Sequence, residues 1–231
     1  MNPMRALTRS LLWCLLLLLT PLVVSCSPSP TAAVAQGCAE ADSACLQGKA
    51  TVLMSTSRGD ITIEVDGDAA PLTAGNFVDL VRRGTYNGTL FHRVVREPVP
   101  FVVQGGDPQS SDRSVPLSQL GTGSFVDPAT GQARLIPLEI SFEGEDGPRY
   151  GRVSTNPSEL NKLALRHDRG AVAMARSQAP NSASAQFYIA LKPLPELDGR
   201  YAVFGRVSEG LEVVDAIRQG DRITKATLAP S

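Results

Sequence analysis

The sequence predicts a mainly β domain in which short strands form a closed or nearly closed barrel and two helices cover it. Short stretches alternate apolar and polar residues, turn-forming glycine, proline and asparagine residues separate these stretches, and only two segments have clear helical spacing. Many short strands with few helices are typical of such barrels. We expect the domain to cover residues 50–230.

The first half of the domain contains two strands, a helix and a third strand. Residues 61–65 alternate with a period of two, and Arg58-Gly59-Asp60 predicts a hairpin turn from the strand before them. Residues 71–83 begin with proline, place their apolar side chains on one helical face and end with two arginines before Gly84, which predicts a helix. Residues 90–95 follow as a strand.

The middle of the chain, residues 107–169, is rich in serine, glycine, proline and aspartate. Residues 136–140 are its only compact apolar patch, and residues 158–165 have the character of a helical turn. A stretch of this length without periodicity is more often a functional loop system than a second domain. It is either a surface that binds a partner or an insertion that the fold tolerates.

Regular structure returns at residue 170. Apolar runs over residues 170–175, 186–191 and 202–207 predict strands, and residues 222–228 predict a closing strand. The spacing of Leu211, Val214 and Ile217 predicts a second helix that ends near Gly220. Alternation along the strands places one of Phe101 and Phe187 in the core, and we expect Phe187 to face inward.

Composition and motifs narrow the function classes. The 231 residues are 42% hydrophobic with a net charge of -1, which describes an ordinary folded core and gives no reason to expect nucleic acid as a partner. No phosphate-binding glycine motif is present, and no nucleophile elbow accompanies His167. Only His92 and His167 occur, away from the cysteines, so we expect no metal site and a structural role for His92.

The amino terminus predicts export. Arg5 and Arg9 precede an apolar run over residues 11–19 that suits a secretory signal better than a membrane span. Val23-Val24-Ser25-Cys26 resembles the lipobox of bacterial lipoproteins, which implies a signal peptide over residues 1–25 and lipidation of Cys26. Two alternatives are cleavage after residues 33–35 and retention of the uncleaved segment as an anchor.

Residues 26–49 follow as an extended tether, because the Ser-Pro-Ser-Pro-Thr stretch after Cys26 cannot pack. The protein is therefore expected to be a membrane-anchored lipoprotein that faces the periplasm or another extracytoplasmic space. Once Cys26 is acylated, Cys38 and Cys45 are left as an even pair in an oxidising compartment, which predicts a small disulfide loop.

The central stretch carries most of the functional signal. Arg93 follows aromatic residues on a predicted strand, and Gln104 ends the next one before two glycines. A single arginine in such a strand is most often a surface residue. The neutral amide of Gln104, however, can orient Arg93 without neutralising it, so the guanidinium stays free to donate to a substrate.

Six segments together resemble cyclophilins, in the order in which that family carries them. They are Phe91-His92-Arg93-Val94-Val95, Phe101-Val102-Val103-Gln104-Gly105-Gly106-Asp107, Met174-Ala175-Arg176-Ser177, Pro180-Asn181-Ser182, Ala185-Gln186-Phe187-Tyr188-Ile189 and Leu197-Asp198-Gly199-Arg200-Tyr201-Ala202-Val203-Phe204-Gly205. Each segment alone is a weak signal, and the ordered set is specific.

The resemblance implies a closed eight-stranded antiparallel β-barrel capped by two α-helices, with a peptide groove on its outer face. It also implies peptidyl-prolyl cis-trans isomerase activity without a cofactor, on proline-containing segments of proteins, by a monomer. The catalytic residues that it implies are Arg93, Gln104 and Phe101. The substrate-binding residues that it implies are Val102, Ala175, Arg176, Ser177, Tyr188, Leu197 and Tyr201.

The chain departs from the cyclophilin pattern at a few positions. Residues 94–100 are longer than the usual spacing between the arginine and the phenylalanine, Val102 replaces a common methionine, and Glu196 replaces a common tryptophan. Tyr201 stands where the family often has histidine. The longer segment raises one alternative function, a proline-peptide-binding chaperone or scaffold with little catalysis.

Overall fold

The computed structural model of the chain describes residues 37–38 and 45–230. The predicted signal peptide over residues 1–25, the Cys26 lipidation site, most of the tether and the alternative cleavage site at residues 33–35 lie outside these described residues. Within the described part of the chain, none of the helices combines the length and the apolar character that crossing a membrane requires.

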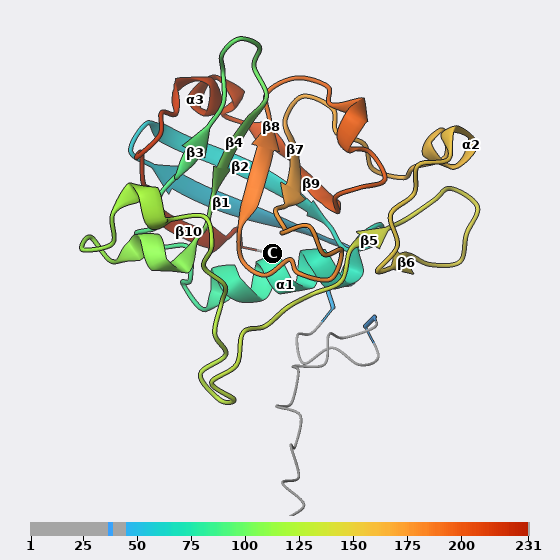
Figure 1. The fold of residues 1–231 in the computed structure, drawn as a ribbon, viewed down its shortest axis with the longest axis horizontal. Helices are drawn as coiled ribbons and strands as arrows, with labels where there is room; N and C mark the ends of the chain where they lie inside the picture. Colours follow the sequence, from blue (N-terminus) through green and yellow to red (C-terminus); the bar gives the residue numbers. More distant parts are fainter. Residues whose placement is uncertain (1–36, 39–44, 231) are drawn as a thin grey trace, which may run out of the picture. The chain divides into compact units, whose positions relative to one another are not determined.

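Eight antiparallel strands form one sheet in the order β10-β1-β2-β9-β7-β8-β4-β3 (Figure 1). They are β1 (Lys49–Thr56), β2 (Gly59–Asp66), β3 (Arg93–Val94), β4 (Val102–Gly105), β7 (Ala171–Met174), β8 (Phe187–Ala190), β9 (Val203–Glu209) and β10 (Ile223–Leu228). The predicted first hairpin is confirmed, because β1 and β2 pair along their whole length, from Lys49 opposite Asp66 to Thr56 opposite Gly59.

The predicted closed barrel is wrong, because the end strands β3 and β10 form no ladder with each other in the described structure. The strand expected over residues 90–95 keeps only two residues. The chain before it turns, and it reaches the far edge through separate backbone bonds, from Ile223 N to Thr89 O and from Phe91 N to Asp221 O, both 2.8 Å. Leu90 and Arg222 form only an isolated bridge between these two edges, so the sheet remains an open half-barrel.

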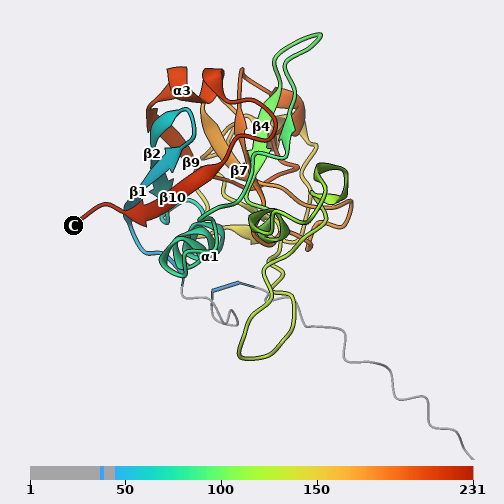
Figure 2. The same ribbon diagram turned by 90° about the vertical axis from the view of Figure 1, so that its left-hand side faces the viewer.

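Two helices cover the two ends of the half-barrel. Helix α1 (Pro71–Arg82) lies below the strands and α3 (Leu211–Ala216) above them in both views (Figures 1 and 2). Helix α1 agrees with the sequence prediction to within one residue at each end, whereas α3 starts where predicted and ends at Ala216, before the stop expected near Gly220. A third helix, α2 (Pro157–Leu160), is a single turn in the middle region.

The core lies between α1 and the inner face of the sheet. The rings of Phe77, Tyr86, Phe187 and Phe204 meet there at centroid distances of 4.8 to 5.4 Å. Phe187 is 0% exposed, so its predicted inward orientation is confirmed. Aromatic packing at these distances and burial of such rings are major contributions to the stability of the fold.

The middle region packs against the domain and has little regular structure. It contains β5 (Glu139–Ile140), β6 (Arg149–Tyr150) and two 3-10 turns, η1 (Pro108–Ser111) and η2 (Leu117–Gln119). Its own apolar cluster consists of Leu138, Ile140, Phe142, Leu163 and Ala202. The apolar patch that the sequence predicted is therefore the anchor of this region.

Glu139 ties the middle region to α1. The helix has no side-chain cap of its own, and the Glu139 carboxylate accepts hydrogen bonds from Leu72 N at 3.1 Å and Thr73 N at 2.7 Å. Unpaired N–H groups at a helix start need an acceptor, and a carboxylate also suits the positive end of the helix dipole. Burial raises the pKa of Glu139 above its ordinary value.

Cys38 and Cys45 form a disulfide with their Cα atoms 5.7 Å apart. The chain just after it is fixed to the domain, because Leu46 N donates to Pro71 O at 3.0 Å. The disulfide therefore closes its loop directly before the point where the chain enters the folded domain.

Candidate active site

The outer face of the sheet carries a second apolar cluster, separate from the core. Its buried members are Val102, Ala171, Ala173, Tyr188, Ala190, Leu194 and Val203, and its half-buried members are Phe101, Leu165, Ala175, Leu197 and Tyr201. We call these residues the outer cluster. It contains six of the residues predicted for the site: Phe101, Val102, Ala175, Tyr188, Leu197 and Tyr201.

Strand alternation explains how one strand serves both faces. On β8, Phe187 and Ile189 enter the core while Tyr188 points into the outer cluster, and on β4 Val103 enters the core while Val102 points outward. The half-buried members add a partly exposed apolar surface to this face of the sheet, which suits contact with a small aliphatic ring.

Arg93 lies at the edge of this cluster. It pairs with Gln104 across β3 and β4, and its Nη1 donates to Gln104 Oε1 at 3.3 Å. Its Cζ lies 5.9 Å from the centroid of the Phe101 ring. Arg93 is exposed on the side of the sheet that carries the outer cluster, and no acidic side chain neutralises it within the described residues.

Gln186 extends the contact behind Arg93, and the sequence analysis gave it no role. Gln104 Nε2 donates to Gln186 Oε1 at 3.3 Å, and Gln186 Nε2 donates to Gly123 O at 2.8 Å. Gln104, Gln186 and the Gly123 carbonyl are all uncharged, so these hydrogen bonds orient the guanidinium without neutralising its charge. The signal was the period of two on this strand, which puts Gln186 on the same face as Tyr188.

A cavity of about 380 Å³ lies next to the hydrogen-bonded side chains of Gln104 and Gln186. Gln104, Gln186, the turn at residues 121–124 and the predicted rail residues Ala175, Arg176 and Ser177 line it. Buried Asp107 fixes the turn, because its Oδ2 accepts hydrogen bonds from Gly121 N at 2.6 Å and Gly123 N at 3.2 Å. A Cβ atom at Gly123 would lie 2.1 Å from Asp107 Oδ1, so only glycine fits there.

A buried polar chain supports the floor of the outer cluster. The Tyr188 hydroxyl lies 2.9 Å from His167 Nε2, and His167 Nδ1 lies 2.8 Å from Asp198 Oδ1. Burial raises the pKa of Tyr188 well above its ordinary value. Burial also tends to raise the pKa of Asp198, but the hydrogen bonds from His167 outweigh this effect and lower it.

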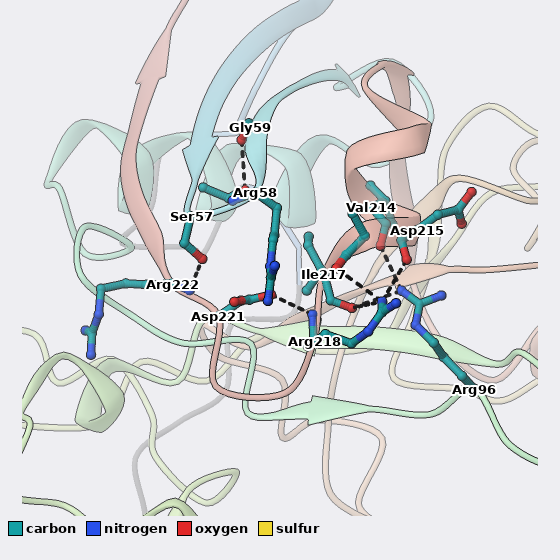
Figure 3. A network of polar contacts seen from close by, with 12 residues as sticks. Ser57, Arg58, Gly59, Arg96, Val214, Asp215, Ile217, Arg218, Asp221 and Arg222 are labelled. Atoms are coloured by element: carbon teal, nitrogen blue, oxygen red, sulfur yellow. Dashed lines mark hydrogen bonds and ion pairs between the residues drawn. The ribbon is translucent and has the colours of Figure 1, made fainter.

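The long segment over residues 94–100 leaves Phe101 next to Arg93. Val95 N donates to Val102 O at 2.9 Å and Phe101 N donates to Val95 O at 3.0 Å, so the extra residues close on themselves as a projecting loop. Arg96 fastens this loop to α3, because its Nη2 donates to Val214 O at 2.9 Å and to Ile217 O at 3.1 Å (Figure 3). The insertion is therefore held against the end of α3.

His92 is 6% exposed and lies beside the turn at Gly121. Burial lowers the pKa of His92, which disfavours a second positive charge next to Arg93. Both ring nitrogens of His92 are buried without a hydrogen-bond partner in the described structure, and its structural role stays a prediction.

Comparison with known proteins identifies the fold and the family. The model for the cyclophilin-type peptidyl-prolyl cis-trans isomerases matches residues 51–230. A candidate thylakoid lumen peptidyl-prolyl cis-trans isomerase of Synechocystis is 42% identical over 191 residues, which cover 78% of this chain and 47% of that protein. This chain thus spans about half the length of that relative.

A candidate peptidyl-prolyl cis-trans isomerase of Brucella abortus is 34% identical over 191 residues, which cover 77% of this chain and 82% of that protein. A crystal structure of a cyclophilin-type isomerase of Cryptosporidium parvum, determined in the presence of the dipeptide Ala-Pro, superposes with a TM-score of 0.57 at 25% identity. That match covers 78% of this chain and 99% of the other. This chain belongs to the cyclophilin-type peptidyl-prolyl cis-trans isomerases.

Proposed function

We propose that this protein accelerates cis-trans isomerisation of X-Pro peptide bonds, with Arg93 as the hydrogen-bond donor to the twisted bond. The observation that carries the proposal is the position of the Arg93 guanidinium, which Gln104 holds beside the Phe101 ring at the open edge of the outer cluster. A charged donor and a partly exposed apolar cluster thus lie side by side.

The chemistry requires one strong donor and no cofactor. Rotation of a peptide bond faces a barrier of about 18–20 kcal/mol, because the nitrogen lone pair is delocalised into the carbonyl. In the twisted state the lone pair returns to nitrogen and accepts a hydrogen bond that the planar bond cannot accept. A donor aimed at the prolyl nitrogen therefore stabilises the twisted state over both planar states.

The surrounding residues supply position. Phe101, Leu197 and Tyr201 hold the proline ring against Val102 and Tyr188, so the ring is anchored while the rest of the peptide turns. The outer cluster also excludes water, which strengthens the hydrogen bond from Arg93. Arginine cannot release its proton at physiological pH, so it acts as a fixed donor and not as an acid.

Isomerisation of a short proline peptide by the purified full chain tests this proposal. We expect Arg93→Ala to lower kcat/KM by about 100-fold or more, in the range found when a transition-state donor is removed. The same variant keeps the affinity for the peptide within a few-fold, because the apolar residues remain. A parent chain that binds the peptide and turns it over no faster than the variant would instead identify a proline-peptide-binding chaperone or scaffold.

We further propose that the protein acts outside the cytoplasm as a monomeric lipoprotein, anchored through Cys26, on proteins that fold there. The Cys38–Cys45 disulfide supports an oxidising compartment, and one relative is named for the thylakoid lumen. Cell fractionation tests the anchor, because Cys26→Ala should move the protein out of the membrane fraction. Retention of the variant in that fraction would contradict it.

A further inference from the structure

The Arg176 side chain contacts several other parts of the protein, a feature that binding a peptide through the backbone of the rail does not require. Its Nε and Nη2 donate to Arg200 O at 3.1 and 2.7 Å, and its Nη1 donates to Ser177 O at 2.9 Å and to Gln178 O at 3.0 Å. Its Cζ lies over the Tyr201 ring, 4.6 Å from the centroid. One guanidinium thus joins two segments of the chain that are more than twenty residues apart.

These two segments meet at the outer cluster, to which Ala175 of the first and Leu197 and Tyr201 of the second belong. Ser177 and Gln178 continue the rail that begins at Ala175, whereas Arg200 and Tyr201 end the wall that starts at the turn η3 (Pro195–Leu197). Tyr201 in turn contacts Tyr188 edge to face at 5.8 Å. Arg176 is therefore connected through Tyr201 to buried Tyr188 of the outer cluster.

We infer that Arg176 is a positioning residue that clamps the wall of residues 195–201 to the rail and so preforms the pocket for proline. The inference rests on the proposed function, because it assigns a role to a residue of that same pocket. It concerns the side chain of Arg176, whereas the rail binds a peptide through its backbone.

The geometry argues against recognition of substrate charge by this arginine. A guanidinium has five N–H donors, and four of the bonds that Arg176 can make go to carbonyl oxygens of its own chain. One face of its plane is covered by Tyr201. A two-point contact with a substrate carboxylate would require breaking the clamp, so the contribution of Arg176 is expected to be independent of the charge of the peptide.

Lysine cannot reproduce the clamp. Its ammonium is a compact point charge, whereas the planar fork of arginine donates in several fixed directions and stacks on a ring. Arg176→Lys therefore separates geometry from charge. Exposed Arg82 on α1 offers a matched control, because Arg82→Ala also removes one positive charge.

The test measures peptide affinity by calorimetry and kcat/KM by isomerisation, with two proline peptides that differ only in a Glu or Lys next to the residue before proline. We expect Arg176→Ala to weaken affinity for both peptides by about tenfold. A change of this size is what the loss of roughly one to two hydrogen bonds would cause. Arg176→Lys should recover less than about a third of that loss, and Arg82→Ala should stay within about twofold of the parent.

Hydrogen exchange supplies a readout that a direct substrate contact would not move. In Arg176→Ala without peptide, the amides of residues 199–201 should exchange faster, whereas the amides of β8 keep their protection. Tyr201→Ala weakens the clamp from its other side. Its effect on affinity should be smaller when Arg176 is already replaced, because the two residues act in one contact.

The inference would be overturned by a loss confined to the Glu peptide, by full recovery in Arg176→Lys, or by unchanged exchange at residues 199–201. Global loss of protection in Arg176→Ala would mark a residue needed for folding and not for the pocket, and would also overturn it. Affinity is measured apart from turnover, so a parent chain that binds peptide without isomerising it refutes the proposed function and still decides the clamp.

Discussion

The two faces of strands β4, β7 and β8 are both apolar, but they are covered differently. The inner face, with Phe187 and Val103, is closed by α1 and by the other strands. The outer face, with Tyr188 and Val102, is covered only by the turn and loop residues of the outer cluster, several of which remain half-buried. The same strands thus contribute one side to a sealed core and the other side to a partly exposed apolar face.

The comparison separates residues that serve stability from residues that serve binding. On the inner face, a side chain is surrounded completely, so its removal leaves a cavity. On the outer face, a half-buried side chain loses less apolar contact when it is shortened. A residue one position away along a strand is therefore expected to give a different kind of phenotype.

The largest expected difference in stability is between the variants Phe187→Ala and Leu197→Ala. Removal of the fully buried Phe187 ring should lower the free energy of unfolding by about 3–5 kcal/mol. Leu197 is half-buried, so Leu197→Ala should cost about 1 kcal/mol or less in stability and should weaken binding of a proline peptide. Denaturant unfolding and calorimetric binding measure both quantities. Equal stability losses for the two variants would remove the distinction between the faces.

Asp198→Asn tests the buried hydrogen bonds among Tyr188, His167 and Asp198 beneath the outer cluster. The folded-state pKa of Asp198 is lowered, so its contribution to stability is present above its unfolded pKa of about 3.9 and is lost as pH falls through the folded value. At pH 7 we expect the variant to be less stable by about 1–3 kcal/mol. Unfolding measured from pH 7 down to pH 3 should show this gap narrowing below about pH 4.

A constant gap between Asp198→Asn and the parent over that pH range would contradict a role for the carboxylate charge. Tyr188→Phe serves as the matched control, because it cuts the same polar chain without removing an acidic group. Its effect should be about 1 kcal/mol and should not follow the titration of an aspartate.

Arg96→Ala probes the projecting loop and has the smallest expected effect. Loss of its bonds to the carbonyl groups at the end of α3 should lower the free energy of unfolding by about 1 kcal/mol, and kcat/KM should fall no more than about threefold, because strand pairing still places Phe101. Val99→Ser at the loop tip, where the side chain is 51% exposed, should change neither value. A fall of about 100-fold in Arg96→Ala would show that the loop itself takes part in the site.

Local patterns predicted most of the strands and both longer helices, because alternation and helical spacing are read within a few neighbouring residues. The closure of the barrel was predicted wrongly, since it depends on pairing between β3 and β10, two strands that lie far apart in the sequence. Contacts between residues that are far apart in the sequence could not be predicted either. His167 and Asp198 lie 31 positions apart, and nothing in the local sequence of either indicates their contact.

The site followed the same division. The ordered motifs pointed to Arg93, Gln104 and the members of the outer cluster, which the structure brings together. Gln186 was not assigned although it stands beside Phe187 in one of those motifs, because a neutral side chain has no chemical signal of its own. The role of Asp107 as the support of Gly121 and Gly123 likewise depends on a turn whose shape the sequence does not state.

The hydrogen bonds from Leu72 and Thr73 to Glu139 limit how this protein can be redesigned. An engineer who trims the middle of the chain to obtain a minimal domain would delete the only carboxylate that receives these two amides in the described structure. The first N–H groups of the helix would then be buried in an apolar environment without a hydrogen-bond acceptor. The middle segment and the helix that seals the core should consequently be kept, moved or replaced as one module.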